Sequence, residues 1–391
     1  MAKSKSDRSK LKPQTKLVTA SRQYAEHGMV NPAVYRASTI TFPDVATFEA
    51  GSQPYLYGRR GTPTSRAFET AVAELEGGHD CKACPSGLAA VTAALLSFLK
   101  SGDHLLMVDT VYHPARHLCD TVLKGFGIST TYYDPLIGKN IAGLIQANTC
   151  AVYCESPGSQ TMEVQDVPAI AEAAHARGAI AIVDNTWSSG HYFKAFAHGA
   201  DVSIQAATKY ICGHSDIMLG TVTCSAATWP QFKETHGTMG YFAGPDDMYL
   251  ALRGMRTLDV RLERHMKSAL TVAEWFRSRP EVETVLHPGL SNAPGHSLWK
   301  RDFTGSSGLF SIVLRPASKK AVAAMLDSLE LFSMGDSWGG FESLVVPFHP
   351  HRTTVEWTSR NPCLRFHIGL EHTDDLIADL RAGFERLANT A

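Results

Sequence analysis

Lys209 lies in a setting that favours chemistry by an amine. It follows the apolar, strand-like run 201–204 and precedes the turn-rich segment 212–216. Burial at the end of a strand would lower the pKa of the ammonium group toward neutrality. A neutral amine can form a Schiff base with a carbonyl or with an aldehyde cofactor. Taken alone, the segment is also compatible with the more ordinary case of a surface lysine that closes a strand.

Asp184 supplies a carboxylate in a matching place. It ends an apolar run that lies one helix–strand unit before Lys209. In a parallel sheet both residues would emerge at the carboxyl edge, where open α/β sheets bind ligands. The pair matches two needs of pyridoxal 5'-phosphate (PLP), because the carboxylate keeps the pyridine nitrogen protonated and the lysine holds the aldehyde.

Three further places offer groups for a phosphate and a flat ring. Ser86-Gly87 begins a run of small, helix-favouring residues, and a helix start offers free N–H groups to an anion. Tyr57 and Arg59 would point the same way on an extended segment and could clamp a phosphate. Tyr112 follows a strand-like run and could stack on a ring. Each signal is weak alone, since many helices start in this way and residues 57–59 also fit a solvated turn.

Alternating strands and helices must position these groups. Strand-like runs at 105–109, 150–155, 179–184, 202–205 and 219–224 alternate with helical stretches, one of which begins at Pro63. This pattern is typical of a mostly parallel sheet covered on both faces. No Gly-x-Gly-x-x-Gly follows a strand, which argues against a dinucleotide-binding fold. Residues 248–279 read as one long helix that leads to an α+β region with strands at 309–314 and 365–369.

Composition excludes several functional classes. The chain has 391 residues, 44% apolar content and a formal charge of −1, so general attraction to nucleic acid or to anionic membranes is not expected. No apolar run reaches the length of a membrane span. The first 16 residues are basic and lack the apolar core of a secretory signal, which predicts a disordered tail.

The cysteines and histidines do not predict a metal site. The eight cysteines are scattered, so a reducing, cytoplasmic location is the default. Cys81 and Cys84 have the spacing of half a zinc site, but no second pair follows. His113 and His117 lack a third ligand. We therefore expect no bound metal.

Three segments resemble one family of enzymes. Residues 86–90 (Ser-Gly-Leu-Ala-Ala), 183–187 (Val-Asp-Asn-Thr-Trp) and 207–216 (Ala-Thr-Lys-Tyr-x-x-Gly-His-Ser-Asp) resemble the Cys/Met-metabolism family of PLP enzymes. The resemblance runs from about Thr15 to the C-terminus. It implies the aspartate-aminotransferase-like (type I) α/β fold, with a mostly parallel sheet in a large domain and a smaller α+β C-terminal domain. It also implies a homotetramer whose active sites are shared between two subunits.

The family's site residues map onto positions of this sequence. The resemblance implies that Lys209 is the Schiff-base lysine and that Asp184 is the partner of the pyridine nitrogen. Other cofactor contacts follow by position: Tyr112 stacks on the ring, Gly87 and Leu88 offer backbone N–H groups to the phosphate, Thr208 offers its hydroxyl, and Tyr57 and Arg59 reach a neighbouring subunit's phosphate. Arg365 is implied to grip the substrate α-carboxylate, with Ser337, Trp338 and Tyr57 also near the substrate.

The resemblance also divides the chain. It implies a tail at 1–16, an arm at 17–62 that contacts a neighbouring subunit, a PLP-binding domain at 63–250 and a C-terminal domain at 251–391 with the substrate carboxylate site. The role of the basic tail is left open.

Three departures favour the β-cleaving members of the family. Trp338 stands where γ-type members usually have Leu, Ala206 where most have Ser, and 155–159 lacks the Asn expected after the proline. The implied reaction is β-elimination of L-cystathionine to homocysteine, pyruvate and ammonia, a step toward methionine. Lys209, helped by Tyr112, would move the protons, and other cysteine S-conjugates would also be accepted.

Two alternatives remain open at this point. One is a γ-lyase or γ-synthase of the same family, which would cleave or form the γ-carbon–sulfur bond. The other is a non-catalytic PLP-binding protein, which the joint presence of Lys209, Asp184 and Arg365 disfavours.

Overall fold

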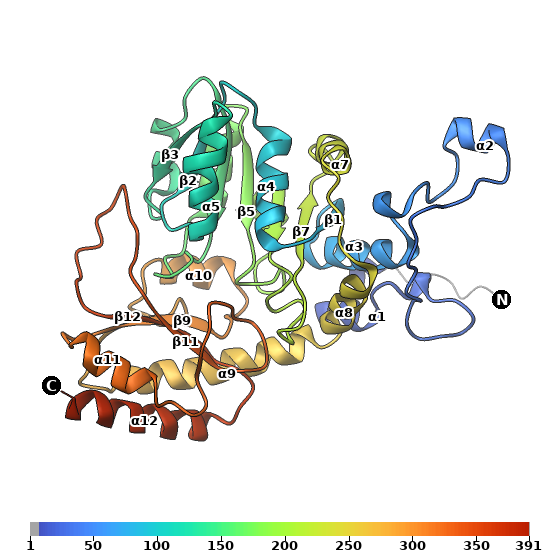
Figure 1. The fold of residues 1–391 in the computed structure, drawn as a ribbon. Helices are drawn as coiled ribbons and strands as arrows, with labels where there is room; N and C mark the ends of the chain where they lie inside the picture. Colours follow the sequence, from blue (N-terminus) through green and yellow to red (C-terminus); the bar gives the residue numbers. More distant parts are fainter. Residues whose placement is uncertain (1–7, 391) are drawn as a thin grey trace.

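Residues 8–390 are described by a computed structural model, which places them in two domains joined by a long helix (Figure 1). The large domain is built on a seven-stranded sheet with the order β1-β7-β6-β5-β4-β2-β3. Its strands are β1 (Asp80–Cys84), β2 (His104–Val108), β3 (Ser129–Tyr133), β4 (Thr149–Glu155), β5 (Ile180–Asp184), β6 (Val202–Gln205) and β7 (Gly220–Cys224). Neighbouring strands from β3 to β6 are parallel, whereas β7 is antiparallel to both β1 and β6. The predicted mostly parallel sheet is confirmed.

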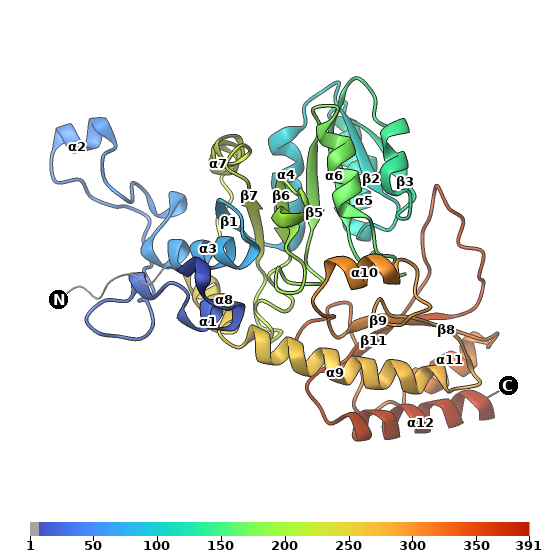
Figure 2. The ribbon, with the colours of Figure 1, turned by 180° about the vertical axis from the view of Figure 1, so that it is seen from behind.

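Helices cover both faces of this sheet. They are α3 (Pro63–Glu76), α4 (Gly87–Phe98), α5 (His113–Leu118), α6 (Val167–His175), α7 (Trp229–Thr238) and α8 (Pro245–Met255). Figure 1 shows α4 and α5 in front of the sheet, and Figure 2 shows α6 in front when the molecule is seen from behind. Because both faces are covered, a central strand such as β2 is buried at every position, as expected for a parallel sheet.

The small domain carries a second sheet, with the order β10-β11-β12-β9-β8. Its strands are β8 (Val282–Leu286), β9 (Leu309–Leu314), β10 (Ser333–Met334), β11 (Leu344–Phe348) and β12 (Cys363–His367), and its helices are α9 (Leu258–Arg277), α10 (His296–Asp302), α11 (Lys319–Leu326) and α12 (Thr373–Asn389). Helices α9 and α12 lie side by side under the sheet in both ribbon views. A core of Phe276, Phe310, Phe366 and Phe384 fills this layer.

The single helix expected over 248–279 is wrong. The chain forms α8 and α9, which are separated near Thr257. The carbonyl oxygen of Gly254 accepts from the Thr257 N–H (3.1 Å) and from Arg261 Nη2 (2.9 Å), so it is not free to continue a regular helix. Helix α8 packs on α3 of the large domain, and only α9 continues into the small domain.

The N-terminal segment also differs in part from expectation. Residues 1–7 of the predicted disordered tail lie outside the described residues. Residues 8–16 are ordered: α1 spans Pro13–Thr19, and Arg8 pairs with Glu74 of α3 at 2.7 Å. Burial of apolar side chains explains this order, because Leu17 and Ala20 pack against α3. Beyond them the arm, which carries α2 (Val45–Ala50), projects from the body of the molecule (Figure 1).

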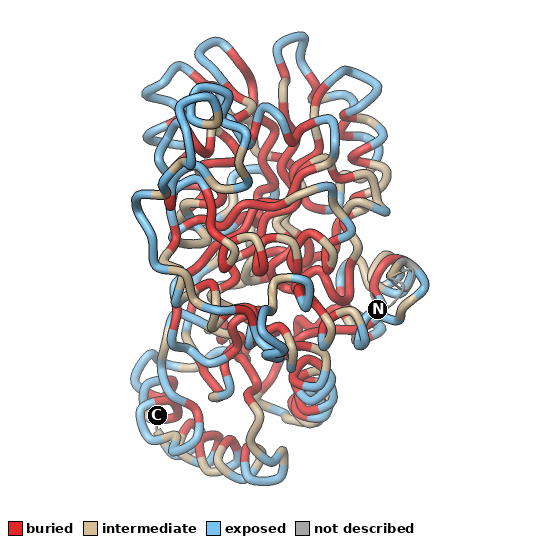
Figure 3. Tube along the Cα trace, turned by 90° about the vertical axis from the view of Figure 1, so that its right-hand side faces the viewer, coloured by how far each residue is buried: buried red, intermediate tan, exposed pale blue. Residues whose placement is uncertain are grey.

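Burial follows the two sheets, with the core running through the middle of both domains (Figure 3). Cys81 and Cys84 belong to strand β1 and are both buried, and all eight cysteines are unpaired. In the part of the chain from 8 to 390, no cluster of three or more His, Cys, Asp or Glu side chains could hold a metal ion. Over the same residues, no helix has the length and apolarity needed to cross a bilayer.

Candidate active site

Lys209 lies in the turn that follows β6, not at the last strand residue. Its Nζ donates a hydrogen bond to Ser337 Oγ at 2.8 Å and lies 5.2 Å from the centre of the Trp338 ring. Burial, reinforced by the charge of Arg365, lowers the pKa of the ammonium group to about 8, while Asp336 opposes this change. The amine is therefore close to the balance between its neutral and charged forms near neutral pH, as the sequence predicted from burial.

Asp184 ends β5 inside a network of hydroxyl donors. Its Oδ1 accepts from the backbone N–H of Thr186 (3.0 Å) and from Thr186 Oγ1 (2.5 Å), and its Oδ2 accepts from the Tyr153 hydroxyl (3.3 Å). Burial raises the pKa of the Asp184 carboxyl, and the bonds from Thr186 and Tyr153 oppose that rise. A cationic ring nitrogen beside this carboxyl would favour its charged form.

Glu155 forms a second carboxyl at the same sheet edge. It ends β4 and pairs in register with Asp184, and its Oε2 accepts the backbone N–H of Tyr112 at 2.7 Å. Burial and the neighbouring Asp184 raise the pKa of Glu155 well above its usual value. A protonated Glu155 is thus compatible with a charged Asp184, because only one of two adjacent carboxyls ionises readily.

Glu155, Tyr153 and Thr186 were not predicted to belong to the site from the sequence. A signal existed for Glu155, because it ends an apolar strand in the same way as Asp184. Thr186 lies two residues after Asp184 within the motif that carries the family resemblance. Tyr153 had no such signal, since a tyrosine within a buried strand is usually part of the core.

Tyr112 lies at the start of α5, after β2, with 45% of its surface exposed. Burial of its hydroxyl is the largest influence and raises the pKa of Tyr112, and the charge of Glu155 raises it further. The charge of Arg365 opposes this rise. Asp184 also acts on this group. The structure therefore brings Tyr112 into the same electrostatic neighbourhood as Asp184 and Arg365.

Arg365 comes from the small domain, on β12. Its Nη2 donates to the backbone oxygen of Asp336 at 2.8 Å, and burial lowers the pKa of its guanidinium. The two residues that follow Asp336 in the chain, Ser337 and Trp338, are the ones that contact Lys209. This loop lies against the backbone of Lys209 at Gly339, where a Cβ would be only 2.8 Å from the Lys209 carbonyl carbon.

The start of α4 can hold a phosphate next to these groups. Ser86 caps the helix by accepting from Ala89 N at 3.1 Å, and the first N–H groups of a helix, here those of Gly87 and Leu88, have no partner within it. A Cβ on Gly87 would lie 2.6 Å from the Ala206 Cβ, so the lysine turn and the helix start touch. The Thr208 hydroxyl bonds to the backbone of Leu219 in both directions, and its expected contact with a phosphate stays a prediction.

These residues fit PLP. Asp184 would face the ring nitrogen, Tyr112 the ring face and Lys209 the aldehyde, and the start of α4 would take the phosphate. Tyr57 and Arg59 make other contacts. Arg59 Nη1 donates to Gly237 O at 2.6 Å, and Tyr57 forms an isolated antiparallel β-bridge with Thr39. No hydrogen bond between described residues joins Tyr57 or Arg59 to Lys209 or Asp184.

Comparison with known proteins agrees with this geometry. The family model described as Cys/Met metabolism PLP-dependent enzyme matches residues 14–385. A putative cystathionine beta-lyase of Rhizobium johnstonii is 49% identical over 363 residues, which cover 92% of each chain. The cystathionine beta-lyase of Escherichia coli (strain K12) is 47% identical over 388 residues, covering 95% of this chain and 98% of that one. A crystal structure of cystathionine gamma synthase from Xanthomonas oryzae pv. oryzae superposes with a TM-score of 0.90 at 32% identity, covering 97% of this chain and 100% of the other.

Proposed function

The chain belongs to the family of Cys/Met metabolism PLP-dependent enzymes, and we propose that it is a carbon–sulfur lyase that performs β-elimination on L-cystathionine. The products are homocysteine, pyruvate and ammonia. The observation that carries the proposal is the convergence of Lys209, Asp184 and Arg365 on one site, in a chain nearly half identical to relatives named cystathionine beta-lyase.

Arg365 and the loop after it would orient the substrate. Asp336 O accepts from one guanidinium nitrogen, which leaves other N–H donors for a bidentate bond to the α-carboxylate. That bond would bring the α-carbon near Lys209, since Arg365 lies close enough for its charge to lower the pKa of the Lys209 ammonium. The Trp338 ring lies beside the amine, with its centre 5.2 Å from Lys209 Nζ.

Lys209 would move the protons of the elimination. PLP, held by Lys209, Asp184 and the start of α4, would supply an electron sink for the α-carbon of the substrate. With its pKa near 8, neutral Lys209 Nζ can take the α-proton, and the resulting ammonium can give a proton to the departing sulfur. Homocysteine leaves, and the remaining three-carbon fragment takes up water to give pyruvate and ammonia.

The β-position of cleavage is supported by Trp338, by Ala206 and by the missing Asn after Pro157. The competing function is γ-cleavage or γ-synthesis, since a cystathionine gamma synthase shares the fold at a TM-score of 0.90. Purified protein incubated with L-cystathionine separates the two. We expect pyruvate, whereas 2-oxobutyrate as the main keto acid would replace β-elimination by γ-cleavage.

A lysine variant tests the assignment of the proton carrier. Lys209→Ala should abolish pyruvate formation, and Lys124→Ala, which changes an exposed lysine, should leave it unchanged. Substantial pyruvate from Lys209→Ala would refute the role given to Lys209.

We also propose that two copies complete each site, within a homotetramer. Tyr57 and Arg59 lie on an arm that exposes Met29, Val30, Val45 and Phe48, each at least 64% exposed, and such an apolar surface favours a partner. Mixing Arg59→Ala with Lys209→Ala subunits should then restore about a quarter of the activity, because half the dimers of a random mixture are hybrids and each hybrid has one intact site. No recovery would show that Arg59 does not serve a partner's site.

A further inference from the structure

A buried carboxyl lies beneath the loop that follows Asp184. Glu76, the last residue of α3, is 1% exposed. Its Oε2 accepts hydrogen bonds from Ser203 Oγ (2.8 Å) and Asn185 Nδ2 (3.2 Å). Its Oε1 has no hydrogen-bond partner among residues 8–390. Leaving a buried carboxylate half-satisfied is costly, and none of the steps proposed for the elimination uses this group.

Asn185 connects Glu76 to the cofactor side of the sheet. It directly follows Asp184, its backbone N–H donates to Ile204 O at 2.8 Å, and its Nδ2 also donates to Phe193 O at 3.1 Å. Glu76 therefore holds, through one side chain, the backbone from which the Asp184 carboxyl projects. The two carboxyls are also electrostatic neighbours, because the charge of Asp184 contributes to raising the pKa of Glu76.

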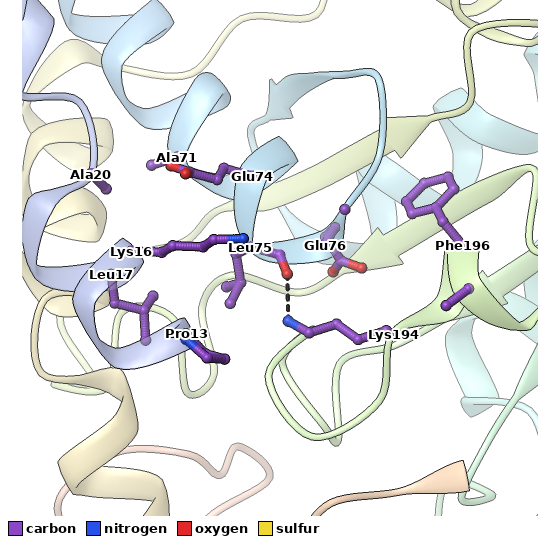
Figure 4. A pocket seen from close by; sticks show the side chains of 12 residues that line it. Pro13, Lys16, Leu17, Ala20, Ala71, Glu74, Leu75, Glu76, Lys194 and Phe196 are labelled. Carbon is purple, nitrogen blue, oxygen red and sulfur yellow. Dashed lines mark hydrogen bonds between the residues drawn. The ribbon is translucent and has the colours of Figure 1, made fainter. Parts of the chain in front are cut away.

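Glu76 also borders a cavity of about 290 Å³ (Figure 4). The cavity lies between α1, α3 and the segment 194–197, with apolar walls from Leu17, Leu75 and Phe196. Lys194 reaches into it and donates to Leu75 O at 2.7 Å and to Gly190 O at 2.6 Å. Water in this cavity would give Glu76 a route for proton exchange.

Four charged groups surround Glu76 or the cavity. Asp184 disfavours its ionisation, and Lys194 favours it. Lys16 of α1 and Glu74 of α3 both line the cavity. The charge of Glu74 is paired with that of Arg8. Burial is the largest influence and, with Asp184, raises the pKa of Glu76 to about 7, against the bonds from Ser203 and Asn185.

We propose that Glu76 is a positioning residue for Asp184 and that its negative charge strengthens the binding of the protonated PLP ring. A cation placed at the Asp184 carboxyl is attracted to both carboxylates. By linkage, binding of the ring favours ionisation of Glu76, and ionisation of Glu76 strengthens binding of the ring by the same factor. The effect belongs only to pH values at which Glu76 is charged.

The test measures affinity for pyridoxine 5'-phosphate in the cofactor-free full-length chain. This probe keeps the ring and the phosphate but has no aldehyde, so Lys209 cannot react with it. Glu76→Gln keeps an acceptor for Ser203 and Asn185 and removes the charge. The ratio of the dissociation constants of Glu76→Gln and wild type cancels all titrations common to both proteins. We expect this ratio to be near 1 at pH 5.5 and to rise to about tenfold at pH 8.5, within the usual range of site–site coupling.

Ser203→Ala is the matched control. It removes a neutral hydrogen bond to the same carboxyl oxygen and leaves the charge, so its dissociation constant relative to wild type should be similar at pH 5.5 and pH 8.5, with any change confined to the range between them, where the lost bond raises the pKa of Glu76 further. A Glu76→Gln ratio that is constant with pH would mean that Glu76 acts only as a structural hydrogen-bond acceptor and would overturn the proposal. A ratio near 1 at every pH would overturn it equally.

Discussion

Asp109 fastens the small domain to the large one, and its removal should loosen that junction. The loop between β11 and β12 rises from the small domain along the large domain (Figure 1). At its far end, Thr353 donates to Asp109 from its N–H (2.9 Å) and Oγ1 (2.7 Å), and Thr354 donates from its N–H (2.9 Å) and Oγ1 (2.7 Å). Arg116 Nη2 adds a bond at 2.6 Å. Tyr112, which we propose contacts the cofactor, lies three residues after Asp109.

The magnitude follows from what would be left behind. Asp109 is 1% exposed, and Asp109→Ala would leave a buried Arg116 charge and four donors without their acceptor. Breaking a buried ion pair by removing one partner costs about 3–5 kcal/mol. In Asp109→Asn one oxygen remains as an acceptor, and we expect about 2 kcal/mol.

The sign with pH is also determined. Burial alone would raise the pKa of Asp109, but the hydrogen bonds from Thr354 and Thr353 outweigh it and hold the pKa well below its usual value. The stabilisation is therefore fully present above the unfolded carboxyl pKa of about 4 and is lost only as the pH falls through the depressed folded value.

Amide hydrogen exchange of Thr353 and Thr354 is the direct assay, since their N–H groups donate to Asp109. A loss of 3–5 kcal/mol in local opening corresponds to an acceleration of about 100-fold or more in Asp109→Ala. Asp120→Ala, which removes an exposed carboxylate bonded to the Tyr132 hydroxyl, should leave both amides protected. Wild-type exchange at both threonines in Asp109→Ala would refute the assignment of Asp109 as the anchor.

Three further predictions concern the active site. The cofactor-free chain should take up PLP at a rate that rises about tenfold per pH unit below pH 8 and then levels off. The reason is that only neutral Lys209, with its pKa of about 8, reacts. Absorbance measures the rate, and a rate that does not change with pH would contradict the prediction. Gly87→Ala should weaken PLP affinity by about tenfold or more, since its Cβ would lie 2.6 Å from that of Ala206, whereas Gly125→Ala, where nothing lies within 4 Å, should bind as wild type does in a fluorescence titration. Arg365→Lys should raise KM for cystathionine by about ten- to hundredfold with a smaller change in kcat, because lysine lacks the planar fork; an unchanged KM in steady-state kinetics would remove Arg365 from carboxylate binding.

Local patterns in the sequence were sufficient for most of the elements. The Ser86 cap and the Gly87 start of α4 were predictable, because capping depends on neighbours within one turn. The break between α8 and α9 was not, since it depends on Arg261 folding back onto Gly254, which an amphipathic pattern does not record.

The sequence by itself determined the chemical types at the site and their family, through Lys209, Asp184 and the motifs around them. Only the tertiary structure decided which other groups share that site. Glu155 meets Asp184 because β4 and β5 are adjacent in the sheet, and Ser337 meets Lys209 because the small domain folds back over the large one. Glu76 reaches the same region from the end of α3. The physical reason is that such contacts join segments far apart in the chain, so they follow from the packing of whole elements, whereas periodicity and capping report only on residues a few positions away.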